Sequence, residues 1–189
     1  VYGVEYHTAS DFLMDGLTMS FSASTDNQAA AGATYAVNSH LAVGGTYVSS
    51  LGDSAVTIGF GFSETDGDKT STEMTSDEGG FHVGVSAVTG DLTVAVGIAD
   101  GDSIENVSAT DTNSVQNDGE YVAAGAKYVS GDLTFNVGFA SGTSKDSDTI
   151  GTAGTTEDSL DSVSASVSYA VASGVTAYIG YTDKDAEDE

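Results

Sequence analysis

The chain has 189 residues and a formal net charge of −25, and it contains no cysteine, proline or tryptophan. This excess of acid argues against binding the phosphate backbone of nucleic acids, and the lack of cysteine excludes disulfides and thiolate metal sites. No apolar run approaches the ~20 residues that a membrane-spanning helix needs, which excludes a helical membrane protein but leaves a β-barrel open.

Alternation of apolar and polar residues predicts eleven β-strands, because successive side chains of a strand point to opposite faces. The expected strands are 1–8, 17–25, 31–37, 41–49, 54–63, 81–88, 92–99, 120–129, 133–140, 163–171 and 174–181. No other expected strand is joined to the segment 54–63 by a tight turn. Either residues 69–76 form a poor twelfth strand that pairs with it, or the residues of this region are assigned to the wrong faces.

Short turns alternate with long polar segments along the chain. The triplets NSH (38–40), TGD (89–91), SGD (130–132) and ASG (172–174) predict tight turns. The stretches VTGDLTVAVGIADG and VSGDLTFNVGFASG repeat one another, so a hairpin plus a loop is the repeating unit. The expected acidic loops are 64–79, 100–119 and 144–160, followed by an acidic tail at 183–189.

The two faces of the predicted strands differ in chemistry. One face is apolar and uncharged, whereas the other carries Ser, Thr, Gly and Ala, with Glu5 and Lys127 as the only charges inside strands. Aromatic residues gather near the strand ends: Tyr6, Tyr35, Tyr128 and Tyr169 near the tight turns, and Tyr47, Phe62, Phe139 and Tyr181 near the loops.

Two aromatic belts around an uncharged band are typical of a transmembrane barrel. A soluble sandwich shows the same alternation, but it exposes charged residues on its polar face. Small uncharged residues fit the wall of a confined aqueous lumen, and closure removes the sheet edges. The sequence therefore favours an all-β, antiparallel transmembrane β-barrel, with 1–189 as a single domain.

Polar-face residues are candidates for lining that lumen. They are Glu5, His7, His82, Lys127, Asn136 and Tyr178. Charged rings tune ion selectivity in other pores, and the alternative is that these are isolated groups wetted by the lumen. No nucleophile elbow or HExxH pattern occurs, so we predict neither an enzyme nor an organic cofactor.

Closely spaced acids are weak candidates for binding Ca²⁺, which prefers carboxylate oxygens. They are Asp66, Asp68, Asp100, Asp102, Glu105, Asp146 and Asp148. No EF-hand or similar repeat contains them, and solvated loop charge is the alternative interpretation. A structural Ca²⁺ on the acidic loops is therefore the only cofactor that the sequence leaves open.

The stretches GVEYHTASDFLMDGLTMSFSAS, GAKYVSGDLTFNVGFASG and SVSYAVASGVTAYIGYTDKDAEDE resemble Gram-negative general porins, particularly the alphaproteobacterial type. The resemblance implies a homotrimer of barrels of about 16 strands, embedded in the outer membrane beside lipopolysaccharide. It implies passive diffusion of ions and small hydrophilic solutes. With eleven or twelve strands and no arginine cluster or inward loop, this chain is expected to be an internal or C-terminal part, without constriction residues.

The acidic loops predict a negative potential at the pore mouth and hence a modest cation preference. The rival hypothesis is a secreted, Ca²⁺-binding β-rich adhesin or surface-layer protein, which would also be acidic and rich in Ser, Thr and Gly. The adhesin predicts solubility without detergent and Ca²⁺-dependent folding.

Overall fold

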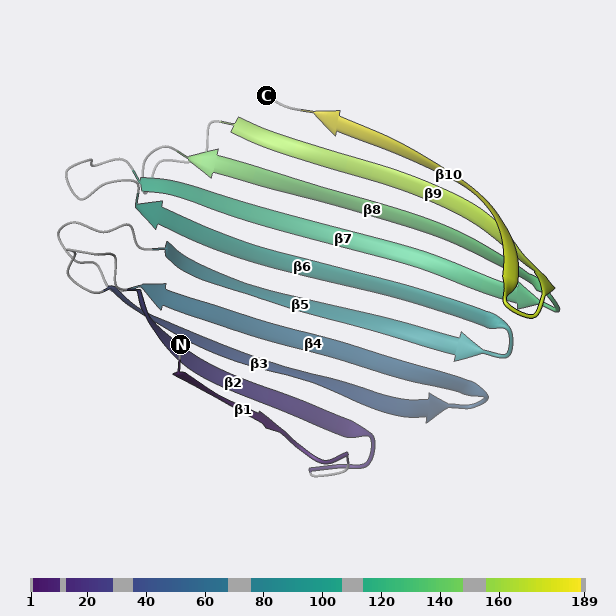
Figure 1. The fold of residues 1–189 in the computed structure, drawn as a ribbon, viewed down its shortest axis with the longest axis horizontal. Coiled ribbons are helices and arrows are strands. Elements are labelled where there is room, and N and C mark those ends of the chain that lie inside the picture. The colour runs from purple at the N-terminus through teal and green to yellow at the C-terminus, as the bar shows by residue number, and fades with distance from the viewer. Residues whose placement is uncertain are drawn as a thin grey trace.

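The chain forms one antiparallel sheet of ten β-strands in the computed structural model, and each strand pairs with the next in sequence (Figure 1). The structure describes residues 2–10, 13–28, 36–67, 76–106, 114–147 and 156–187. The strands are β1 (Tyr2–His7), β2 (Leu17–Gln28), β3 (Ala36–Leu51), β4 (Ser54–Gly67), β5 (Ser76–Thr89), β6 (Leu92–Asn106), β7 (Ser114–Ser130), β8 (Leu133–Ser147), β9 (Thr156–Ala172) and β10 (Val175–Glu187). Among these residues no helix is long and apolar enough to span a membrane.

Short turns close the hairpins at one end of the sheet, on the right in Figure 1. The register leaves the Gly-Asp pairs 52–53, 90–91 and 131–132 as two-residue turns. Their glycines have φ of 61°, 56° and 58°, the positive value that primed hairpin turns require and that glycine adopts without strain. The carbonyl of Asp91 also accepts a 2.9 Å hydrogen bond from the Val129 amide, which ties the turn to β7.

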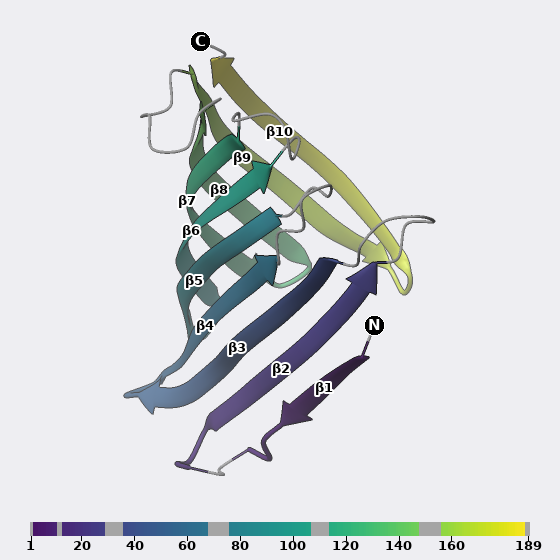
Figure 2. The ribbon, with the colours of Figure 1, turned by 90° about the vertical axis from the view of Figure 1, so that its left-hand side faces the viewer.

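The sheet is a single curved layer. Figure 2 shows the strands following one another around an open wall, with β1 and β10 as its two edges. Among the described residues no large side chain is fully buried, and apolar residues such as Val96, Val137 and Ile179 are 51%, 57% and 74% exposed. Within the described ranges, no second layer covers the sheet in the way that would bury an apolar face inside a soluble domain.

One predicted turn is wrong, and one turn was missed. The NSH triplet lies inside β3, where Ser39 pairs with Asp66 and His40 with Thr65. The turn that closes this hairpin is 52–53, so β3 is the partner that the segment 54–63 lacked. Residues 36–37 and the expected strand 41–49 belong to this one strand, while 31–35 lie outside the described residues. Three consecutive polar residues were interpreted as a turn. A strand can also contain them where both of its faces are exposed to water. Residues 69–75 lie outside the described residues, and β5 begins at Ser76.

The acidic segments expected as loops and tail are in large part strand. β4 continues to Gly67, β6 to Asn106, β8 to Ser147 and β10 to Glu187. β7 and β9 begin well before the expected loop ends at 119 and 160. The backbone ladder does not depend on the side chains being apolar, so the hairpins extend beyond the apolar band. The TGD, SGD and ASG turns lie where they were predicted.

Candidate pore wall

The strand register divides the sheet into two chemically distinct faces, because directly paired residues of an antiparallel ladder lie on the same face. We call the apolar one the outer face: Val96 of β6 pairs there with Val85 of β5 and Ala124 of β7. The other is the inner face, where Gly97 pairs with Gly84 and Ala123. The predicted alternation is thus confirmed across neighbouring strands.

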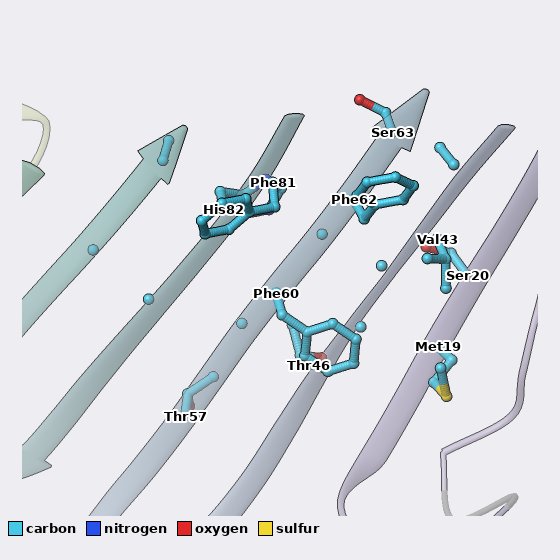
Figure 3. A pocket seen from close by; sticks show the side chains of 18 of the residues that line it. Met19, Ser20, Val43, Thr46, Thr57, Phe60, Phe62, Ser63, Phe81 and His82 are labelled. Carbon is cyan, nitrogen blue, oxygen red and sulfur yellow. The ribbon is translucent and has the colours of Figure 1, made fainter. Parts of the chain in front are cut away.

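A groove of about 1010 Å³ follows the inner face from β1 to β7, and Glu5, Ser20, Thr57, His82 and Gly125 are among the residues that line it. Figure 3 shows the groove from close by, with labelled side chains from β2, β3, β4 and β5. The inner-face residues are mostly small, so backbone atoms form much of the groove floor. Such a floor combines the hydroxyl groups of Ser and Thr with the small apolar surfaces of Gly and Ala.

The six candidate lumen residues all occupy inner-face positions, but they are spread over five strands. On β1, His7 Nε2 lies 2.8 Å from Glu5 Oε1, and both side chains are about two-thirds exposed. Lys127 of β7 pairs with Asn136 of β8, and Asn136 Nδ2 donates a 3.2 Å hydrogen bond to Ser166 Oγ. His82 is on β5 and Tyr178 is on β10. They therefore line a wall without converging on one site, and their role in a pore stays a prediction.

Sequence reasoning missed several ionisable residues at inner-face positions. His40 was assigned to a turn, yet it lies in β3, where Nδ1 is 3.0 Å from Thr65 Oγ1. Glu78, Asp158 and Lys184 belong to the strand extensions that were interpreted as loops or tail. Continuing the alternation through the charged segments would have assigned them correctly.

The outer face carries acids beyond its apolar band, so the expectation that it is uncharged is wrong at the loop end. We call this zone the acidic rim; its residues are Glu64, Asp66, Asp100, Asp102, Asp118, Glu120, Glu157, Asp161, Asp183, Asp185 and Glu187. Asp100 pairs directly with Glu120, and Asp161 with Asp185, and like charges in such positions repel. Lys145 lies among these acids: it pairs with Asp118, and its Nζ is 3.3 Å from Glu157 Oε2.

The structure brings together few of the Ca²⁺ candidates. Asp66 is on β4, whereas Asp100 and Asp102 are on β6, and β5 separates the two strands. Glu105 and Asp146 belong to β6 and β8, while 68 and 148 lie outside the described residues. Within the described part of the chain, no three His, Asp or Glu side chains are grouped as a metal site would require.

Most of the predicted belt residues occupy the outer face. Tyr6, Tyr128 and Tyr169 lie near the short-turn end and are about half exposed. Tyr47 lies at this end too, because β3 ends at Leu51, so its expected place near the loops is wrong.

Phe62, Phe139 and Tyr181 lie further along their strands, on the loop side of the apolar band. The next outer-face residues after Phe62 and Tyr181 are Glu64 and Asp183, so these two rings mark the border between the band and the acidic rim. Residue 35 is outside the described residues. A belt function for these aromatic residues stays a prediction.

Comparison with known proteins agrees with this geometry. A family model of the Gram-negative porin matches residues 3–189. The in-vitro folded, trimeric form of OmpT, an outer membrane protein of Vibrio cholerae, is similar with a TM-score of 0.59 and 17% identity, covering 97% of this chain and 54% of that one. The siderophore receptor PiuA of Acinetobacter baumannii has a TM-score of 0.52 and 10% identity, with 99% of this chain and 43% of that one covered.

The chain spans about half the length of these solved structures. No curated protein sequence matches it. The structural likenesses indicate a shared barrel fold, and the family model covers almost every residue. The chain therefore belongs to the Gram-negative porin family, and its ten strands form part of the wall of an outer-membrane β-barrel.

Proposed function

We propose that this chain lines a water-filled channel through which ions and small hydrophilic solutes diffuse passively, without a catalytic step. One observation carries the proposal: the outer face exposes Val, Ile, Leu and Phe, while the inner face of the same strands carries Ser, Thr, Gly and Ala. Lipid on one side and water on the other is the environment that satisfies both faces.

The two edge strands support a larger barrel than these ten strands alone. β1 and β10 each pair with one neighbour in the described structure, and an unpaired backbone group in hydrocarbon costs several kcal/mol. We propose that further strands close the barrel and that three barrels assemble, as in the trimeric form of the Vibrio cholerae protein.

A modest cation preference follows from the charge of the whole chain, −25. The inner face adds to it, because the acids at inner-face positions outnumber the two lysines there, Lys127 and Lys184. These acids are Glu5, Asp26, Glu78, Glu105, Asp146 and Asp158. The preference should therefore arise both along the lumen and at the pore mouth, where summed negative potential concentrates cations.

The acidic rim also faces outward, toward the headgroups around the barrel. We propose that the rim meets lipopolysaccharide there. Carboxylates and phosphates repel one another, so divalent cations such as Ca²⁺ would mediate this contact.

Single-channel recording of detergent-purified protein in a planar bilayer tests the channel. We expect stepwise openings in groups of three and a cation-selective reversal potential under a KCl gradient. Lys127→Gln should increase the cation preference, because it removes a positive charge from the inner face. Lys145→Gln, on the outer face, is the comparison variant and should change selectivity less than Lys127→Gln does, because its side chain faces away from the lumen.

Three results would contradict the proposal. A bilayer that shows no channel openings would contradict the channel function. An anion-selective reversal potential would contradict the cation preference. A protein that is soluble without detergent and folds only with Ca²⁺ would favour the secreted adhesin instead.

A further inference from the structure

We propose that glycines of the inner face leave space in which large side chains lie against the wall, and that these glycines thereby set the free cross-section of the pore. We call each such space, together with the ring that fills it, a recess. The recesses are Gly61 with His82, Gly180 with Tyr178 and Gly142 with Tyr121. This inference rests on the proposed channel function and adds to it the residues that determine how wide the lumen is.

The clearest recess is on β4 and β5. Gly61 and His82 pair directly across the two strands on the inner face. A Cβ added to Gly61 would lie 2.8 Å from Nε2 and 3.1 Å from Nδ1 of His82, closer than carbon and nitrogen can pack without displacement. The imidazole therefore occupies the volume that any side chain at 61 would need.

The two tyrosines of the inner face repeat this arrangement. Tyr178 lies over Gly180 of its own strand, where an added Cβ would be 2.8 Å from the ring carbon Cζ. Tyr121 pairs with Gly142 across β7 and β8, and here the Cδ2 atom would be 3.2 Å from the added Cβ. The three rings thus lie along the sheet, with the recess at Gly142 the loosest.

Glycine is a poor choice inside a strand unless something needs the space, because it adds no packing and loses more conformational entropy on folding than other residues. An aromatic ring lying over a glycine offsets that cost. Gly59 provides the contrast: it is on the same strand and face as Gly61, yet a Cβ there would meet nothing within 4 Å. Gly61 therefore controls the position of a ring, whereas Gly59 does not.

Replacing Gly61 by alanine should push the His82 ring off the wall and into the lumen. Ion flow depends on the diameter of the pore and on the groups that line it. We expect Gly61→Ala to lower the single-channel conductance on the order of 1.3-fold, because one imidazole obstructs only part of the cross-section. Gly180→Ala should act similarly, Gly142→Ala less, and the matched control Gly59→Ala not at all.

A double variant separates ring displacement from damage to the fold. His82→Ala in the Gly61→Ala background should restore the wild-type conductance, since no ring remains to be displaced. Gly45→Ala is a folding control: its added Cβ would lie 2.8 Å from Phe60 Cζ on the outer face, so it strains the sheet without touching the lumen. Heat-modifiable migration on gels verifies that each variant has folded.

The packing itself is measured without any ion flow, as a nuclear Overhauser effect between the His82 Hε1 and Gly61 Hα protons in detergent micelles. We expect this signal in the wild type and its loss in Gly61→Ala. Its absence from the wild type would overturn the inference, as would an active channel in which Gly61→Ala and Gly59→Ala conduct equally. A silent bilayer with the signal present would overturn the channel function, and with it the role of the recesses in a pore.

Discussion

The two faces of β6 differ in chemistry although both are open in the structure. Val94 and Val96 are 43% and 51% exposed on the outer face, and Thr93 and Ala95 alternate with them on the inner face. In a soluble protein the apolar face would be covered by a second layer. The outer face of this sheet is therefore buried by the membrane around it and not by a second layer of protein, so the two faces should respond differently to the same substitution.

Val96→Lys should have the largest effect on stability. A lysine facing lipid near the middle of the apolar band is expected to cost about 2–4 kcal/mol of unfolding free energy. The neighbouring Ala95→Lys, which faces the lumen, should change it by about 0.5 kcal/mol or less. Urea unfolding in lipid vesicles measures both variants, and equal losses at the two positions would contradict the assignment of the faces.

The acidic rim allows a sharper test within the outer face alone. Glu120→Gln should raise the unfolding free energy by about 0.2–1 kcal/mol, because it removes a charge directly opposite Asp100. Lys145→Gln should lower it by a similar amount, since Lys145 is 3.3 Å from Glu157. Both effects should shrink in high salt. A loss of stability in Glu120→Gln would argue against repulsion across the rim.

The smallest expected effect concerns the inner face. Glu5→Gln removes the carboxylate that lies 2.8 Å from His7 Nε2, and both side chains are about two-thirds exposed. Exposed pairs of this kind contribute about 0–1 kcal/mol, so we expect little change in the thermal midpoint. A large drop would mean that β1 is held in place through this pair rather than through its backbone ladder with β2.

Periodicity predicted the faces well, since the pairing of β6 with β5 and β7 keeps apolar residues opposite one another. The turns at 90–91 and 131–132 were also recognised, because a Gly-Asp pair between alternating segments has a specific backbone geometry. The turn at 52–53 has the same Gly-Asp pair. It was not predicted, because the polar residues at 38–40 were assigned as the turn of this region.

The extent of the strands was harder to predict. Glu64, Asp100 and Glu120 continue the alternation of their strands, yet their charge suggested loops. Charged side chains on the outer face indicate only where contact with lipid ends. The backbone hydrogen bonds between the strands continue beyond that point, into water. The recess of His82 over Gly61 could not be predicted either, because it depends on the cross-strand register, which a single strand's pattern does not specify.

Cysteine scanning along β6 tests the central claim most directly, because the chain has no cysteine of its own. Single cysteines at positions 92–99 would be exposed to a membrane-impermeant maleimide in reconstituted vesicles. We predict fast labelling at the inner-face positions 93, 95, 97 and 99 and protection at 92, 94, 96 and 98, where lipid covers the side chain. Uniform labelling at all eight positions would contradict a wall with lipid on one face and water on the other.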